Sequence, residues 1–248
     1  MTPTMKERRH LIGHLLDERQ PADALAAYYA FYHAAERTRL VVTPAGVERA
    51  EGYIALSRTG MDLFRPLLTL RLPPDLEQAT ALIYEALRPE TAVILSTPQP
   101  YLPLIRACFT IHSEEQLQLM PLDPSRFEPV INVLVTQEAG IGDRPRFVIR
   151  NRTQDNEVAA AATVNWQTPY LAEVSVNTQA GYRRQGYGRS VLAALVHHLL
   201  AEGIQPLYVV RTDNATSIQL ARALGFVDSG QREWLLHATL NPPPAAVL

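Results

Sequence analysis

The chain has 248 residues with 23 basic and 25 acidic side chains, a formal net charge of −2, and 47% hydrophobic residues. This composition is typical of a folded globular protein and excludes a strongly basic surface of the kind that binds nucleic acid or anionic membranes. Cys108 is the only cysteine, which excludes an intrachain disulfide and favours a reducing, cytoplasmic location. No secretory signal pattern and no apolar run near the roughly 18 residues of a bilayer span is seen, so no membrane association is expected.

The first half of the chain predicts helices and strands in alternation, from hydrophobic periodicity and from proline and glycine positions. In chain order the expected elements are a helix over 22–37, a hairpin over 53–58 and 63–72, a helix over 76–87, a strand over 92–96, a helix over 102–109 and a strand over 116–120.

The second half predicts three strands followed by alternating helices and strands. The expected strands cover 146–150, 158–166, 171–178, 207–212 and 233–240, with a turn at 153–156 and helices at 190–202 and 216–224. The order β-β-β-α-β-α-β predicts an α/β fold in which helices pack on a mixed sheet.

Both halves share the order hairpin, helix, strand, helix, strand. A boundary near Pro121–Pro124 predicts an N-terminal domain over 1–123 and a C-terminal domain over 124–248. Where the second half has a glycine loop, the first half has Pro73 and Pro74, which lack N–H donors. The first half is therefore either a degenerate copy that has lost its ligand or an unrelated α/β cap.

The glycine loop follows the strand over 171–178 and reads Arg183-Arg184-Gln185-Gly186-Tyr187-Gly188 before a helix begins. Backbone N–H groups in such a loop, together with the N-terminus of the next helix, form a site for a phosphate or diphosphate. The Gly-Lys-Ser/Thr of a P-loop is missing. Val191 occupies the third glycine position of a dinucleotide fingerprint, which argues against a redox Rossmann domain.

The pattern Arg183-x-x-Gly186-x-Gly188, followed downstream by Asn214 and by Leu224-Gly225-Phe226, resembles the GNAT superfamily of N-acetyltransferases. The resemblance covers roughly residues 145–240 and looks closest to the glycine-N-acyltransferase-like branch, because Thr178 and Tyr182 also fit before the loop. It implies the GNAT fold, acetyl-coenzyme A as co-substrate, and transfer of an acetyl group to a primary amine in a ternary complex, an activity of EC class 2.3.1.

The resemblance and the loop chemistry together predict the cofactor-binding residues. These are Val176, Asn177, Thr178, Arg183, Arg184, Gln185, Gly186, Tyr187, Gly188, Arg189, Asn214 and Ser217. A backbone N–H near Asn177 or Thr178 is expected to face the oxyanion. Asn214 and Ser217 have the alternative role of polar residues that begin the next helix.

Glu173 is the predicted general base, acting through water, because an amine must lose a proton before it attacks. Strand alternation places it on one face with Ser175 and Asn177, and this polar face suggests a wet cleft. The interval from Glu173 to Thr178 is one residue shorter than is usual in the family, so a bulge is needed to direct Glu173 into the cleft. The alternative is an exposed strand carboxylate.

Many GNAT enzymes have a tyrosine seven residues after the asparagine, and here that position is Ala221. The sequence thus leaves two functions open: an N-acetyltransferase acting on a small-molecule or peptide amine, and a non-catalytic module that binds or senses acyl-coenzyme A. No metal is expected, and a homodimer is an open alternative to a monomer.

Overall fold

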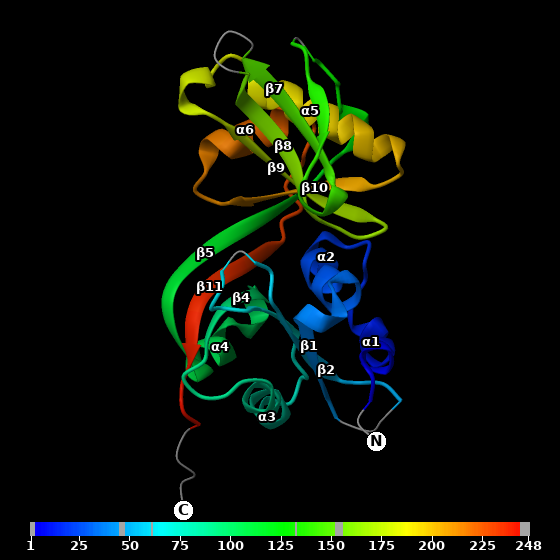
Figure 1. The fold of residues 1–248 in the computed structure, drawn as a ribbon. Coiled ribbons are helices and arrows are strands. Elements are labelled where there is room, and N and C mark those ends of the chain that lie inside the picture. Colours follow the sequence, from blue (N-terminus) through cyan, green and yellow to red (C-terminus); the bar gives the residue numbers. More distant parts are fainter. Residues whose placement is uncertain (1–2, 45–47, 61, 132, 152–155, 244–248) are drawn as a thin grey trace, which may run out of the picture. The chain divides into compact units, whose positions relative to one another are not determined.

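The computed structural model describes residues 3–44, 48–60, 62–131, 133–151 and 156–243. The chain forms two compact units (Figure 1). The first contains residues 1–117 and 232–248, and the second contains residues 118–231. In the described part of the chain, no helix has both the length and the apolar character needed to cross a bilayer.

The first unit combines four α-helices with a mixed sheet among the described residues. Its helices are α1 (Met5–Ile12), α2 (Pro21–Ala27), α3 (Leu76–Ala86) and α4 (Leu102–Cys108). Its strands are β1 (Thr38–Thr43), β2 (Gly52–Ser57), β3 (Leu67–Arg71), β4 (Ala92–Pro98), the larger part of β5 (Phe109–Pro121) and β11 (Arg232–Leu240). The strand order is β1-β2-β3-β4-β11-β5. The β3–β4 pair is parallel, whereas the β1–β2, β2–β3 and β4–β11 pairs are antiparallel.

Strand alternation divides the buried residues of this unit between two cores. One core joins α3 and α4, which lie on one face of the sheet in Figure 1, to apolar residues of the central strands. These residues are Leu68, Leu70, Val93, Leu95, Leu236 and Ala238. The other core joins α1 and α2 to β1 and β2 through small and apolar residues such as Ala26, Ala27 and Leu40.

The second face of this sheet also buries polar groups. Arg71 on β3 forms an ion pair with Asp23 on α2, and the Ser96 hydroxyl on β4 donates to the carboxylate of Glu233 on β11. Glu233 is 9% exposed, and its burial raises the pKa of its carboxyl above the usual value. These contacts connect α2 to β3 and β11 to β4.

The second unit is a twisted sheet with one long helix across it. Its described elements are β6 (Thr136–Ala139), β7 (Pro145–Asn151), β8 (Glu157–Gln167), β9 (Leu171–Thr178), α5 (Tyr187–Ala201), β10 (Gln205–Arg211) and α6 (Ala215–Ala223). The order is β6-β7-β8-β9-β10, and the end of β5 (Phe109–Pro121) lies beside β10. The first four strands are antiparallel, whereas β10 runs parallel to β9.

Helix α5 packs across β7, β8 and β9, as Figure 1 shows. Its buried residues Val191, Leu192 and Leu195 join Ala162 and Val174 of the sheet in one core. This packing fixes the N-terminus of α5 next to the end of β9, which is where the glycine loop lies.

Most predicted elements are confirmed, with three corrections in the first half. The strand expected over 63–72 begins only at Leu67, because residues 62–64 form a bend in which Leu63 and Phe64 are exposed. The helix expected over 22–37 is wrong beyond residue 32. Helix α2 continues as a π-helix over Tyr28–Tyr32, and the helix ends at His33, which is extended with a ψ of 148°. The strand expected over 116–120 is the end of the longer β5, and β1, β6 and α1 were not predicted. The turn expected over 153–156 lies largely outside the described residues.

The shared order of the two halves is present. The elements β2, β3, α3, β4 and α4 correspond in order to β8, β9, α5, β10 and α6. The predicted boundary at 123/124 differs from the division between the two compact units. The first unit extends to residue 117 and also includes residues 232–248. The reason is β11, which follows the second unit in the chain but pairs with β4.

Candidate functional site

The glycine loop has a backbone conformation that leaves its N–H groups available. Arg184 and Gly186 have positive φ values of 63° and 79°, and Gly186 is the N-cap of α5 without a side-chain cap. The first loop-to-helix bond is donated by Ser190 N–H to the Gly186 carbonyl. Within the described chain, no acceptor is recorded for the N–H groups of residues 184–189. Such a row of donors at a helix N-terminus suits a diphosphate.

Gly188 lets this loop approach β9 closely. A Cβ atom built on Gly188 would lie 2.9 Å from Thr178 Oγ1 and 3.7 Å from Val176 Cγ2. Gly188 is buried, and a side chain there would require the Thr178 side chain or the loop to shift. Glycine is therefore required here for packing against β9, whereas Gly186 is required for its positive φ.

A cavity of about 700 Å³ lies against this loop, and most of the predicted cofactor-binding residues line it. The lining contains Val176, Asn177, Thr178, Arg183, Arg184, Gly186, Tyr187, Gly188, Arg189, Asn214 and Ser217. Gln185 is the one predicted member that does not, because its side-chain amide turns to the Gly181 carbonyl at 3.3 Å. Tyr182, Thr216 and Leu220 complete the lining.

The cavity lies beyond the point where two parallel strands separate. Their register pairs Gln205–Tyr208 with Leu171–Val174, while β10 continues to Arg211 and β9 continues to Thr178. Past the pair of Tyr208 and Val174, backbone groups of β9 that would otherwise bond to β10 are left for a ligand. An extended chain inserted there can form ladder-like hydrogen bonds with β9.

Several lining side chains also stabilise the loops that carry them. Asn214 Oδ1 accepts from the Ser217 N–H at 3.1 Å and caps α6, so the alternative capping role is present. Arg183 Nε donates to the Thr178 carbonyl at 3.3 Å. Arg189 donates to the Ala223 carbonyl at 3.3 Å, and its buried Nε has no hydrogen-bond partner within the described chain. An orphaned guanidinium donor beside the cavity is a second feature that suits an anion.

A pair of hydroxyl groups lies beside the cavity, and of the two the sequence indicated only that of Ser217. Tyr208 on β10 is buried, and its hydroxyl lies 2.6 Å from Ser217 Oγ on α6. Burial raises the pKa of the Tyr208 phenol, an effect that the Ser217 hydrogen bond partly offsets. The ring packs on Phe226 with 5.5 Å between centroids, which holds the hydroxyl towards Ser217.

Glu173 lies in a polar network on the opposite face of β9 from Val174. Its Oε1 accepts from Asn165 Nδ2 at 2.8 Å, and Asn165 Oδ1 accepts from the Ser175 hydroxyl at 2.9 Å. The Ser175 hydroxyl also contacts Thr163 Oγ1 at 2.9 Å. The polar face predicted for this strand is therefore present, but Glu173 does not line the 700 Å³ cavity.

The bulge expected in this region is on the neighbouring strand. Val164 pairs with Val174 and Trp166 pairs with Glu173, so the extra residue is Asn165 of β8. Arg144 donates to the carbonyl of Asn165 and, at 3.4 Å, to that of Val164. The bulge directs the Asn165 amide at Glu173, and Arg144 supports the backbone of the bulge.

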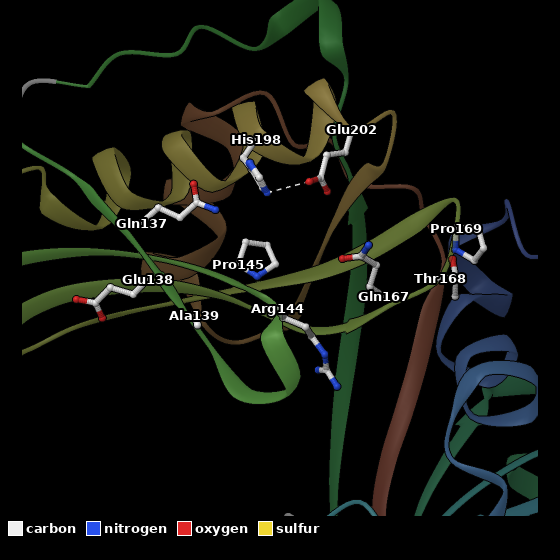
Figure 2. Close-up of a pocket in the computed structure, with 10 residues that line it drawn as sticks. All are labelled: Gln137, Glu138, Ala139, Arg144, Pro145, Gln167, Thr168, Pro169, His198 and Glu202. Carbon is white, nitrogen blue, oxygen red and sulfur yellow. Dashed lines mark ion pairs between the residues drawn. The ribbon is translucent and has the colours of Figure 1, made fainter.

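A larger cavity of about 960 Å³ lies at the other end of α5, between β6, the β8–β9 turn and the helix C-terminus (Figure 2). None of the predicted site residues lines it. Its charged groups already have partners: His198 lies 3.2 Å from Glu202, and Glu138 lies 2.8 Å from Arg150. In the described chain, no three His, Cys, Asp or Glu side chains group in a way that could hold a metal ion.

Comparison with protein families matches a segment that lies mostly in the second unit. Residues 151–235, which include the start of β11, match the family model described as FR47-like protein. A curated relative, the ribosomal protein bS18-alanine N-acetyltransferase of Escherichia coli, is 32% identical over 82 residues. These residues are 33% of this chain and 55% of the relative, so the chain spans about half the length of the curated relatives it matches.

Solved structures match the fold of the whole chain. A Drosophila protein superposes with a TM-score of 0.70 at 12% identity, covering 94% of this chain and 95% of its own. A tandem GNAT protein from the clavulanic acid pathway has a TM-score of 0.66 at 13% identity and covers 97% and 96%. A GCN5-related N-acetyltransferase from Kribbella flavida has a TM-score of 0.60 at 18% identity and covers 86% and 95%. The fold is that of GNAT acetyltransferases, and the tandem neighbour fits the two-half architecture.

Proposed function

We propose that this protein, which has the GNAT fold and an FR47-like segment over residues 151–235, transfers an acetyl group from acetyl-coenzyme A to a primary amine. The observation that carries the proposal is the row of N–H groups at residues 184–189, which lack acceptors in the described chain and adjoin a 700 Å³ cavity. The cavity lining fits the co-substrate, because donors for a diphosphate and a strand edge for an extended arm adjoin each other.

Each part of the lining has a proposed role. The N–H groups of the loop and the side chains of Arg183, Arg184 and Arg189 hold the diphosphate. Val176, Asn177 and Thr178 offer backbone groups to the extended arm beyond the last pair of β9 and β10. Bound acetyl-coenzyme A supplies an activated acetyl thioester. A backbone N–H near Asn177 or Thr178 faces the oxyanion, for which one such donor is worth about 3 kcal/mol of barrier.

Glu173 is the proposed base, and it accepts the amine proton through water. The Asn165 amide holds one oxygen of its carboxylate at 2.8 Å, which fixes its orientation. Because Glu173 lies on the face away from Val174, the acceptor amine approaches from that face, while the co-substrate occupies the gap between the strands. Asn165 acts through Glu173 and is therefore a positioning residue.

Turnover tests the proposal directly. Purified protein with acetyl-coenzyme A is screened for thiol release against small amines, amino acids and peptides with a free alanine amine, the last because the E. coli relative is named for an alanine acceptor. We expect Glu173→Gln to lower kcat by about 100-fold or more and to leave acetyl-coenzyme A binding intact. Glu157→Gln, an exposed carboxylate on β8, is the matched control and retains turnover.

Asn165→Ala separates positioning from binding. We expect it to lower kcat by about tenfold, because the Glu173 carboxylate loses its hydrogen bond, while KM for acetyl-coenzyme A stays unchanged. Equal kcat values for the variant and the wild type would remove Asn165 from the mechanism.

A second function, binding or sensing of acyl-coenzyme A without turnover, is favoured by two observations. Glu173 does not line the cavity, and the buried position 221 carries only a methyl group. Calorimetric binding of acetyl-coenzyme A with no thiol release against any acceptor would support this function over catalysis. Absence of binding would overturn both.

A further inference from the structure

Cleavage of a thioester by an amine places negative charge on sulfur. The C–N bond forms, the C–S bond breaks, and its electron pair leaves with the sulfur as a thiolate. Because thiols have pKa values of about 8.5, a thiolate is a fairly stable anion, and one hydrogen-bond donor close to the sulfur is enough to stabilise it further. Such a donor must lie beside the cavity and be free of other hydrogen-bonding roles.

The hydroxyl pair of Tyr208 and Ser217 is located where such a donor is needed. Tyr208 is the last residue of β10 that pairs with β9, so it marks the point at which the strands separate. Its hydroxyl lies 2.6 Å from Ser217 Oγ, and Ser217 lines the cavity. Ser217 precedes Ala221 by one helical turn, so the two positions share one face of α6.

The surroundings of the two hydroxyls favour one direction for this pair. Tyr208 is buried and has Ser217 Oγ as its hydrogen-bond partner within the described residues, whereas Ser217 also faces the cavity and can donate there. When Tyr208 donates to Ser217 Oγ, the Ser217 hydrogen is free to point into the cavity. The Phe226 ring, 5.5 Å from the Tyr208 ring between centroids, limits rotation of the phenol.

We propose that Ser217, oriented by Tyr208, donates a hydrogen bond to the sulfur of the co-substrate and stabilises the leaving thiolate. This rests on the proposed function, since it concerns the same cavity. The amine proton goes to Glu173 through water, and the released thiolate takes a proton from solvent. Ser217 keeps its proton throughout, so no step requires a further reactant. Ser217 is then a catalytic residue, and Tyr208 is a positioning residue.

The test uses coenzyme A itself, so no acceptor is needed. The thiol of coenzyme A bound at saturation is titrated by its thiolate absorbance in the ultraviolet, with protein alone as the blank. The wild-type protein is expected to lower the pKa of the bound thiol by about one unit relative to free coenzyme A. Ser217→Ala and Tyr208→Phe are each expected to remove most of that shift.

Two further variants keep the test specific. Ser217→Thr retains the hydroxyl and is expected to retain the shift. Tyr84→Phe makes the same chemical change in the first unit and is expected to leave the shift unchanged. In Ser217→Ala the Asn214 cap survives, because Asn214 Oδ1 accepts from the backbone N–H of residue 217.

The outcomes separate this proposal from the function on which it rests. Calorimetric binding of coenzyme A with an unshifted thiol pKa, or a shift that both variants retain, overturns the role of Ser217 and leaves acetyl transfer standing. Absence of binding by the wild-type protein overturns the proposed function itself.

Discussion

Gly186 and Gly188 of the loop are needed for different reasons, although they are only two residues apart. Gly186 has a φ of 79° and open space around its Cβ position, whereas Gly188 has ordinary φ and no space. A side chain at position 186 therefore strains the backbone by about 1–2 kcal/mol, while one at position 188 collides with β9. The distinction predicts different consequences for the same substitution.

Gly188→Ala is expected to weaken coenzyme A binding by tenfold or more with little loss of overall stability. The added methyl group would lie 2.9 Å from Thr178 Oγ1, so either the Thr178 side chain or the loop must shift, and both line the cavity. Calorimetric titration with coenzyme A measures the effect. Gly181→Ala is the matched control, since nothing lies within 4 Å of its Cβ position. Equal affinity for both variants would show that the loop tolerates the displacement.

The lone thiol of the protein also has a defined state. Cys108 is buried among the residues of the first core, and burial raises the pKa of its thiol. It therefore contributes little to assays that detect released thiol groups, which keeps the turnover screen interpretable.

At the scale of elements, helices and strands with a clear periodicity of apolar residues were predictable from the sequence. The segments against which they pack were not. The strand over 171–178 and the helix that starts at residue 76 are confirmed, because apolar periodicity and caps define them locally. The helix expected to reach residue 37 ends at the π-turn, where Tyr28 and Tyr29 pack edge to face at 5.0 Å. Tyr29 is also buried with Leu67 of β3 and Ile94 of β4, a tertiary contact that hydrophobic periodicity does not reveal.

The candidate site shows the same difference between local and tertiary features. The position of the loop residues around one cavity was predictable, because the spacing of glycine and arginine is a local pattern that marks a loop with exposed N–H groups. Asn165 and Tyr208 were not, because each reaches its partner across strands or helices: Asn165 reaches Glu173 eight residues on, and Tyr208 reaches Ser217 nine residues on. No local spacing rule encodes those contacts.

The burial of Glu233 on β11 predicts a stability that depends on pH. Its pKa is raised in the folded state, chiefly by burial, so the folded protein holds this proton more tightly than the unfolded chain does. The stabilisation is fully present below the unfolded pKa of about 4.5 and is lost as pH rises towards the folded pKa. Stability relative to Glu233→Gln should fall by up to about 1.4 kcal/mol per pH unit in that window.

Chemical denaturation at pH 4.5–8 measures this difference. Of the two tryptophans, Trp234 lies on β11 in the first unit and Trp166 lies on β8 in the second. A Trp166→Phe background therefore leaves a fluorescence reporter in the unit that contains Glu233. Parallel stability curves for Glu233 and its Gln variant would mean that the carboxylate is solvated after all.

At the scale of the whole molecule, the last described strand is essential to the first unit. Leu236, Ala238 and Leu240 of β11 are buried in the core that α3 and α4 cover. We expect a chain that stops after Gln231 to lose hydrogen-exchange protection in β4, because β4 loses a neighbour and its core loses three apolar side chains. Amides of α5 serve as the internal reference, and they should remain protected. Unchanged protection of β4 would show that β11 is dispensable.

The pairing of β11 with β4 also has a consequence for biosynthesis. A ribosome makes the chain from its N-terminus, so most of the first unit leaves the exit tunnel long before the strand that completes its sheet. One edge of β4 in the nascent first unit therefore stays unpaired while the more than one hundred residues of the second unit are translated. The first unit therefore completes its sheet only after the second unit has been synthesised, and a chaperone that shields the β4 edge during translation would act on the step most exposed to aggregation.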